Sequence, residues 1–360
     1  MPGGPGIDVV LDKIQSISYR GTMSKTILVV TDNLPEQING VVTTFRNLEK
    51  LAVLDGYRIV YLDPGQFLHF GCPGYPEVKL SIPWQISDKI RALAPDHIHI
   101  ATEGPVGLCA RLYLDQHNVC YNTSYHTRFP EFVKKMYHVP ESWTYAYLRW
   151  FHKHSGRVLT TTDTMVSELR SHGFAGEVLS WTRGVDRDTL RPTRDWPRSH
   201  DYGSRTRVVS VGRVSREKGL EDLLELHGEF DITVVGDGPQ RAELQARYPG
   251  VQWLGYRTGS ALADAYAQAD VMCFTSRADT FGIVMIEAMS VGTPVAAYPV
   301  PGPQDVIEPG VTGHMDWDLA RAIRRCTNLD GADVQRASAR WTWQACWEIF
   351  RQNLVPVTKL

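Results

Sequence analysis

The sequence predicts an α/β protein of two domains, each a doubly wound parallel sheet covered by helices. At 360 residues the chain exceeds one domain of ordinary size. Short apolar segments of strand character alternate with longer amphipathic segments along most of its length. The alternation breaks once, over 187–205, which is rich in Pro, Arg, Asp and Ser and has no hydrophobic period. We therefore expect a first domain over 23–186, a linker over 187–205 and a second domain over 206–340.

In the first half, short apolar runs that end on polar or glycine-containing turns predict the strands, and amphipathic segments between them predict helices. This order is typical of a parallel sheet, because parallel strands need a crossover connection. Residues 1–22 precede Met23 and the first strand, and we expect them to be a disordered extension that carries no chemistry. The expected strands are 26–30, 57–62, 96–101, 119–123, 157–161 and 177–181, and the expected helices are 41–54, 106–116 and 142–154.

The second half repeats the pattern. An amphipathic segment over 341–353 is expected to cross back onto the first domain. Ligands of open α/β sheets bind at the carboxyl ends of the strands, so polar residues that directly follow a strand are candidate site residues. The expected strands are 208–211, 232–235 and 271–274, with helices at 217–227 and 239–248.

The composition narrows the class of protein. With 43% hydrophobic and 22% charged residues and a formal net charge of -2, the chain is typical of a globular protein and gives no overall reason to bind nucleic acid. No apolar run approaches the roughly 18 residues of a membrane span. The six cysteines form no C-x-x-C pair. We expect a cytoplasmic protein that meets a membrane only peripherally, on its inner face.

The segment 276–289 has the clearest chemical pattern. An apolar strand runs into Asp279, then Gly282, then a helix that contains Glu287. Glycine permits close backbone approach, and a helix N-terminus attracts phosphate. The two acids are spaced to accept hydroxyl hydrogen bonds on either side of that phosphate, which indicates a sugar nucleotide. The alternative is an ordinary strand, turn and amphipathic helix whose acids are solvated. The backbone N–H groups expected to meet the phosphate belong to Ile283 and Val284.

Two cations follow the first strand of the second half. Arg213 and Lys218 lie in the turn 212–219, at the expected mouth of the sheet. They are placed to clamp a diphosphate and to stabilise the charge that grows on it as it leaves. The alternative is that they are surface charges beside a strand-to-helix turn.

Polar residues also follow strands of the first half. His126 and Arg128 come directly after a strand, and Glu103 ends another at the same expected edge. Glu103 is placed to meet an acceptor hydroxyl, although a helix-capping carboxylate explains it equally well. A solvated or buried structural histidine is the ordinary alternative for His126.

These motifs, in this order, resemble the retaining glycosyltransferases of family 4. Asp279 and Glu287 are similar to the family's Glu-x7-Glu signature, with Asp in place of the first Glu, and 212–219 is similar to its Gly-Arg…Lys-Gly element. The resemblance extends from Lys25 to the end of the chain. It implies the GT-B fold, in which two Rossmann-like domains face each other across a cleft.

The resemblance also implies roles for individual residues. Asp279 would bind donor-sugar hydroxyls, Glu287 the ribose, and Arg213 with Lys218 the diphosphate. His126 would contact the donor sugar near the reacting carbon, and Arg128 would approach phosphate or acceptor. The remaining donor-binding residues that it implies are Gly40 and Val41 at the start of a first-domain helix, Gly255 and Tyr256 at the base, and Gly282, Ile283 and Val284 at the phosphate.

The implied reaction moves a hexosyl unit from a UDP- or GDP-sugar to an acceptor hydroxyl with retention. Arg183 begins an Arg-Gly-Val-Asp segment, which resembles the corresponding segment of family branches with glycolipid acceptors, including sulfoquinovosyl and mannosyl transferases. A membrane lipid such as diacylglycerol is therefore the expected acceptor. The segment 132–138 is a candidate contact with an anionic surface, and a solvated helix face explains it equally well. Other readings remain open: a nucleic-acid base or soluble glycan as acceptor, a nucleotide-sugar epimerase of the same fold, or a degenerate sugar-nucleotide binding module.

Neither a metal nor a cofactor is expected. Asp186 with Asp188, and Asp316 with Asp318, match an Asp-x-Asp pattern by which other glycosyltransferases hold a divalent metal. We interpret both matches as accidental, because the cations of 212–219 and the helix N-termini already supply positive charge. No His/Cys cluster indicates zinc.

Overall fold

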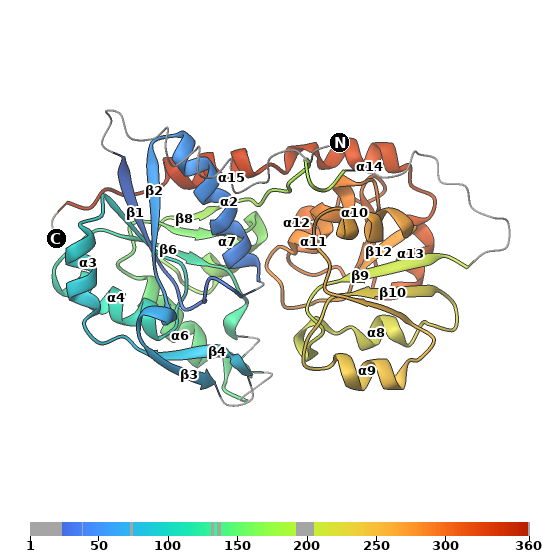
Figure 1. Cartoon of the computed structure of the whole chain (residues 1–360), viewed down its shortest axis with the longest axis horizontal. Coiled ribbons are helices and arrows are strands. Elements are labelled where there is room, and N and C mark those ends of the chain that lie inside the picture. Colours follow the sequence, from blue (N-terminus) through green and yellow to red (C-terminus); the bar gives the residue numbers. More distant parts are fainter. Residues whose placement is uncertain are drawn as a thin grey trace, which may run out of the picture.

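Two six-stranded parallel sheets, each flanked by helices, form the two halves of the molecule (Figure 1). A computed structural model describes residues 24–37, 39–72, 75–130, 133–134, 138–191 and 205–358, without the side chains of 72–78. The expected extension 1–22 and most of the expected linker lie outside the described residues, as do 132 and 135–137 of the candidate surface segment. The prediction of two Rossmann-like α/β domains is confirmed.

The first sheet has the strand order β2-β1-β5-β6-β7-β8. β1 pairs on both sides and five of its six residues are buried, as its continuous apolar run requires. Its strands are β1 (Lys25–Val30), β2 (Tyr57–Leu62), β5 (His97–Ile100), β6 (Asn122–Tyr125), β7 (Val158–Thr160) and β8 (Val178–Ser180). Its helices are α2 (Gly40–Leu54), α3 (Ile86–Leu93), α4 (Pro105–Gln116), α6 (Glu141–His152) and α7 (Asp163–Ser171).

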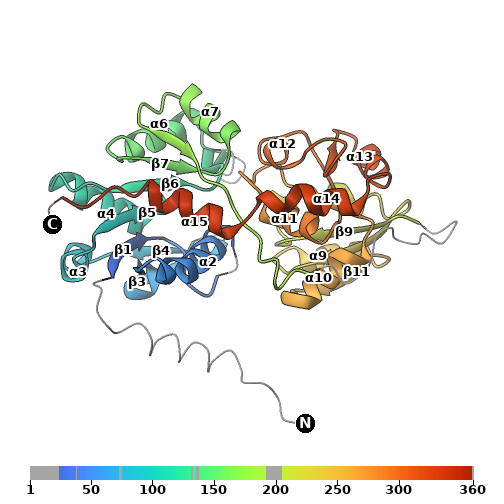
Figure 2. The ribbon, with the colours of Figure 1, turned by 90° about the horizontal axis from the view of Figure 1, so that it is seen from above.

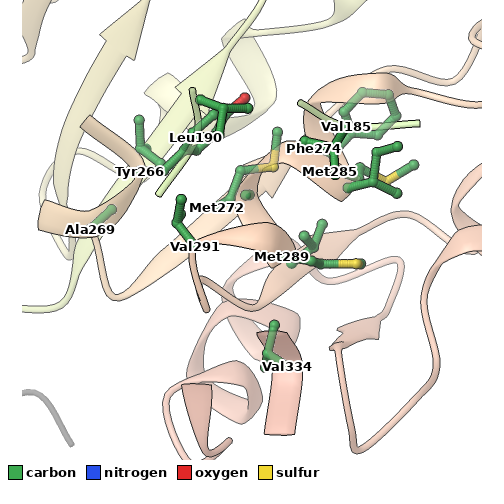
Figure 3. Close-up of a cluster of buried hydrophobic side chains, with 14 of the residues drawn as sticks. Val185, Leu190, Tyr266, Ala269, Met272, Phe274, Met285, Met289, Val291 and Val334 are labelled. Carbon is green, nitrogen blue, oxygen red and sulfur yellow. The ribbon is translucent and has the colours of Figure 1, made fainter. Parts of the chain in front are cut away.

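The second sheet has the order β11-β10-β9-β12-β13-β14, so the order in which successive strands are added reverses between β9 and β12. Its core includes residues of β12 and of four helices, and Val185 and Leu190 pack there too (Figure 3). The strands are β9 (Arg207–Val211), β10 (Asp231–Val235), β11 (Gln252–Gly255), β12 (Val271–Phe274), β13 (Val295–Ala297) and β14 (Gly313–Met315). The helices are α8 (Glu221–Leu224), α9 (Arg241–Arg247), α10 (Gly259–Gln268), α11 (Ile283–Ser290), α12 (Pro303–Val306), α13 (Leu319–Cys326) and α14 (Gly331–Ala337).

The last helix, α15 (Trp343–Gln352), lies on the first domain, whereas α14 lies on the second (Figures 1 and 2). Trp347 and Phe350 are buried there, and the Trp347 indole N–H donates to the Asp55 carboxylate at 2.7 Å. A Cβ on Gly184 would lie 2.1 Å from the Trp343 nitrogen, so only glycine lets the two crossing segments touch.

A hairpin that the sequence analysis missed projects from the first domain. Strands β3 (Leu68–Cys72) and β4 (Tyr75–Ile82) pair antiparallel, with Leu68 opposite Ile82 and Phe70 opposite Leu80. Directly opposed residues share a face, so these four apolar side chains lie together. The opposite face carries Ser81, which is buried. The hairpin therefore turns its polar face inward and its apolar face to solvent.

Two other expectations were wrong in detail. The strand expected at 119–123 lies at 122–125, and the helix expected at 217–227 is a 3₁₀ turn, η2 (Arg216–Lys218), followed by the short α8. Gly219 separates the two in the left-handed conformation, with φ of +61°. This break directs Lys218 toward β12, where the Thr275 hydroxyl donates to its carbonyl oxygen at 2.7 Å.

Candidate functional site

Segments at the carboxyl ends of the two sheets touch where the domains meet. Thr127 after β6 and Asp279 after β12 form an antiparallel backbone bridge. The Thr280 hydroxyl donates to the His126 carbonyl oxygen at 2.6 Å, and the Thr161 hydroxyl donates to the Thr280 carbonyl oxygen at 2.8 Å. The residues predicted for the site in each half are therefore brought to one junction.

At this junction Lys218 and Asp279 form an ion pair. The Lys218 ammonium donates to both Asp279 carboxylate oxygens, at 2.7 and 2.8 Å. Both side chains keep some exposure, 29% for Lys218 and 27% for Asp279. A charge-assisted pair that stays accessible can exchange one partner for a charged ligand. The prediction had given these two residues different parts of the same donor.

The N-terminus of α11 lies beside this pair. Gly282 precedes the helix with φ of +82°, and a Cβ there would lie 2.8 Å from Phe274 Cζ, so no other residue fits. No side chain within the described residues caps the helix, which leaves the first N–H groups, of Ile283 and Val284, to a ligand or solvent. A Cβ on Gly40, which opens α2, would lie 3.8 Å from Ile283 Cδ1. The starts of α2 and α11 thus meet across the junction.

Glu287 lies one turn into α11 and is held by Tyr266. The Tyr266 hydroxyl donates to Glu287 Oε2 at 3.0 Å. Burial raises the pKa of Glu287 from its ordinary value of 4.5, and the Tyr266 hydrogen bond partly offsets this. A half-buried carboxylate that one neighbour holds through one oxygen, with its pKa raised, is a functional-site candidate.

The ends of three neighbouring strands of the second sheet approach one another closely. A Cβ on Gly236, after β10, would lie 1.8 Å from the Gly212 carbonyl oxygen, after β9. The Gly236 N–H donates to the Gly255 carbonyl oxygen at 2.9 Å. Arg213 follows Gly212 and is half-buried, and Tyr256 follows Gly255 with half of its surface exposed. Gly236 thus connects the turn predicted to bind the base with the turn predicted to bind the diphosphate.

The His126 ring is held inside the first domain. Its Nε2 lies 2.8 Å from Ser124 Oγ, and its Nδ1 lies 2.8 Å from Arg183 Nη2. Because a guanidinium only donates, Nδ1 accepts and the proton is on Nε2. Burial, with the Arg183 charge and His99 adding to it, holds the pKa of His126 well below its usual range. The ring is neutral, and the backbone carbonyl is the His126 group that faces the second domain.

Arg183 served in the sequence only as a marker of subfamily, and the structure makes it part of the site's support. It is 2% exposed, and its Nη1 donates to the carbonyl oxygens of Trp181 and Thr182 at 2.7 and 2.9 Å. Burial lowers the pKa of Arg183 to about 10, so it is still charged at neutral pH. The described residues include no carboxylate paired with it.

The two residues that were predicted to meet the sugar acceptor are paired with other side chains of the first domain. Arg128 donates to Glu168 Oε1 at 3.2 Å, and Glu103 Oε1 lies 3.3 Å from His152 Nε2 within the first domain.

The Asp-x-Asp pairs are engaged locally. Asp186 Oδ1 accepts from the Asp188 N–H at 3.1 Å, and Asp316 accepts from Arg321 at 2.6 Å, which lowers the pKa of Asp316 to about 2. Across the residues that the structure describes, no group of three or more His, Cys, Asp or Glu is arranged to hold a metal. None of the described helices is both long enough and apolar enough to cross a bilayer.

The sequence analysis missed Thr161, Tyr266 and Thr280. Thr280 had a usable signal, because it directly follows Asp279 in a turn expected at the sheet edge. Tyr266 and Thr161 had none, since each meets its partner only through the fold.

Two family models match the chain, one for each half. Residues 38–189 match the model of glycosyltransferase family 4, and residues 205–328 match that of glycosyl transferases group 1. A GDP-mannose-dependent alpha-mannosyltransferase of Mycolicibacterium smegmatis is 32% identical over 268 residues, 72% of this chain and 69% of that protein. The sulfoquinovosyl transferase SQD2 of Arabidopsis thaliana is 29% identical over 83% of this chain, which spans 58% of that protein's length.

Solved structures share the fold. Sucrose-phosphate synthase from Thermosynechococcus elongatus superposes with a TM-score of 0.73 at 20% identity, over 91% of this chain and 98% of that one. Anabaena Alr3699/HepE in complex with UDP superposes with a TM-score of 0.65 at 15% identity, over the same shares. At these identities the likeness shows the fold alone.

Proposed function

The chain belongs to glycosyltransferase family 4 and has the GT-B fold, and we propose that it transfers a hexosyl unit with retention at the anomeric carbon. The unit would pass from a UDP- or GDP-sugar to a hydroxyl of a membrane lipid such as diacylglycerol. The observation that supports it most is the joint placement of Lys218, Asp279, the α11 N-terminus and Glu287. The cation and helix N-terminus suit a diphosphate, and the two carboxylates suit the hydroxyls on either side of it.

Donor binding would redistribute the existing ion pair. A diphosphate entering beside Lys218 offers its ammonium a stronger anion than Asp279, so the carboxylate is released toward the sugar hydroxyls. Arg213 adds a second cation from the same turn, and Glu287 accepts from the ribose. Gly255 with Tyr256 would meet the base, and Gly40 with Val41 would close on the phosphates from the first domain.

The chemical step depends on stabilising the leaving group. The bond from the anomeric carbon to the diphosphate oxygen breaks, and the bond to the acceptor oxygen forms on the same face of the sugar. The acceptor's proton passes to the departing phosphate oxygen, so no carboxylate nucleophile is needed. Lys218, Arg213 and the α11 N–H groups stabilise the charge that develops on the diphosphate. No metal enters this scheme.

The hairpin supports a lipid as acceptor. Leu68, Phe70 and Ile82 on its outer face are 73%, 54% and 51% exposed, and Trp84, just after it, is 77% exposed. Of the eleven large hydrophobic residues exposed in the described structure, nine belong to the first domain. An apolar face beside an exposed Trp suits the interface of a bilayer, where aromatic rings are enriched. The hairpin would thus bring the acceptor domain to the membrane that holds the lipid.

Nucleotide release by the purified protein tests the proposal. UDP- and GDP-hexoses are supplied separately, with EDTA, and with or without liposomes that contain diacylglycerol. Release that requires the liposomes and survives EDTA is the expected result. Release without any acceptor lipid but stimulated by a soluble glycan or DNA would refute the lipid acceptor, and conversion of the donor to another nucleotide sugar would indicate an epimerase.

A further inference from the structure

We propose that Thr280 is a positioning residue, which fixes the Asp279–Lys218 pair relative to the first domain through its two hydrogen bonds across the domain junction. The inference rests on the proposed transfer reaction only for its kinetic consequence. Thr280 is 3% exposed and directly follows Asp279. It touches neither of the two charges itself, so it would act by holding the backbone that carries them.

Apart from its N–H, Thr280 has two polar groups, and both form hydrogen bonds with the first domain. Its hydroxyl donates to the His126 carbonyl oxygen at 2.6 Å, and its carbonyl oxygen accepts from the Thr161 hydroxyl at 2.8 Å. One residue earlier, the backbone bridge joins Asp279 to Thr127. Two neighbouring positions of each domain, 126–127 and 279–280, are therefore joined, one pair by the backbone bridge and the other through the Thr280 hydroxyl.

The first-domain side of this pairing is rigidly held. Ser124 and Arg183 fix the His126 ring at 2.8 Å each, and Arg183 is in turn buried and bonded to the Trp181 carbonyl oxygen. A buried guanidinium bonded to backbone carbonyls has few alternative positions. The carbonyl that Thr280 meets is thus a fixed reference point.

The second-domain side leads directly to the reacting groups. Asp279 holds both of its carboxylate oxygens on Lys218, and a Cβ on Gly302 would lie 2.9 Å from the Asp279 carbonyl oxygen. Asp305 near Gly302 accepts from the Thr164 N–H of the first domain at 3.0 Å. The turn that carries Asp279 therefore packs against Gly302 of its own domain and is hydrogen-bonded to the first domain through Thr280. A shift at Thr280 would move the Asp279 carboxylate. Displacements of about 1 Å cost about 10²-fold in rate.

The test replaces Thr280 by Val, which keeps the branched shape and removes the hydroxyl, and by Ser, which restores it. Thr160→Val is the matched control, because the buried Thr160 hydroxyl donates to the Tyr125 carbonyl oxygen at 3.2 Å within the first domain alone. We expect Thr280→Val to lower kcat by roughly 10-fold while the Kd of free UDP or GDP changes less than about 2-fold. Thr280→Ser is expected to recover most of kcat, and Thr160→Val to keep it.

Amide hydrogen exchange gives a readout that needs no activity. In Thr280→Val, peptides covering 276–282 and 124–130 are expected to exchange faster than in the wild type, and in Thr160→Val at the wild-type rate. Unchanged exchange in Thr280→Val overturns the proposal, as does an unchanged kcat or a failure of Ser to rescue. If the wild type transfers no sugar, the proposed function fails, and the exchange data still decide the role of Thr280.

Discussion

Lys218→Met removes the cation nearest Asp279 while keeping a long unbranched side chain. In the structure the ammonium lies 2.7 Å from the carboxylate and is partly exposed, so a diphosphate can approach it to contact distance. The variant has no positive charge where negative charge develops on the leaving diphosphate, and it also leaves Asp279 without its cation. Both effects oppose departure of the nucleotide, so kcat is expected to fall more than the donor's affinity.

The size of the loss follows from the exposure of the pair. Two unit charges 4 Å apart interact by about 1 kcal/mol in water and by about 4 kcal/mol at an effective dielectric constant of about 20. At 29% exposure Lys218 lies between these limits, and we take about 2 to 3 kcal/mol. At about 1.36 kcal/mol per tenfold, the expected loss of kcat is roughly 30- to 160-fold.

Steady-state nucleotide release at saturating donor measures this loss. Arg216→Met is the control, because Arg216 is an exposed cation on the same 3₁₀ turn, η2, and is expected to keep kcat within about 2-fold. Thermal unfolding of both variants checks that the fold is kept. If Lys218→Met retained wild-type kcat, or if Arg216→Met lost as much, the leaving-group role of Lys218 would be wrong.

Three further predictions concern separate parts of the site. Glu287→Gln is expected to weaken nucleotide binding by roughly 10- to 100-fold, the cost of a charged hydrogen bond. The variant is also expected to gain stability relative to the wild type as pH rises. Burial raises the pKa of Glu287, so the folded wild type binds more protons than the unfolded chain between the ordinary pKa of about 4.5 and the raised pKa. The wild type therefore loses stability as pH rises through that window, and the variant does not. Gly282→Ala is expected to lower both stability and turnover, since its Cβ would lie 2.8 Å from Phe274 Cζ at a φ of +82°. Serine at three outer hairpin positions is expected to abolish sedimentation with anionic liposomes while donor binding is kept; the positions are Leu68, Phe70 and Ile82.

Thermal unfolding and steady-state nucleotide release check the Gly282→Ala prediction, which is wrong if both are unchanged; the other two have checks of their own. Calorimetric titration of nucleotide, and unfolding curves between pH 4 and 8, would contradict the Glu287 prediction if the variant bound normally or if its stability relative to the wild type did not change with pH. For the hairpin, Leu54→Ser is the control, because Leu54 is 79% exposed at the end of α2. Liposome binding that survives the hairpin substitutions, or that is lost equally with Leu54→Ser, would exclude the hairpin as the membrane contact.

The strands that the sequence predicted well are those made mostly of apolar residues. The ranges expected for β2 and β12 match the structure, and those for β1, β9 and β10 differ by one residue at the start. β6 was misplaced because its first three residues, Asn122, Thr123 and Ser124, are polar yet fully buried, each satisfied by a partner far along the chain. Periodicity cannot identify a buried strand whose hydrogen bonds replace apolar contacts.

The site shows the same division. The motifs identified the segments that meet at the junction, because a strand followed by a glycine turn and a helix is a local pattern. The pairing of Lys218 with Asp279 spans 61 positions, and the bond from Thr161 to Thr280 spans 119, so neither has a local signature. The inward direction of Arg128 and Glu103 depended likewise on distant partners, Glu168 and His152. Local chemistry therefore named the candidates, and the fold decided which side chains point at one another.

The most direct test of whether the second-domain side of the junction is the donor site is calorimetric titration with UDP and with GDP. The proteins titrated, all in EDTA, are the wild type, Lys218→Met and Glu287→Ala. The expected result is one bound nucleotide per chain for at least one of the two, with affinity reduced roughly 10-fold or more in Glu287→Ala and less in Lys218→Met. Equal affinity in all three proteins, or binding of neither nucleotide to the wild type, would contradict the assignment of this junction to the donor.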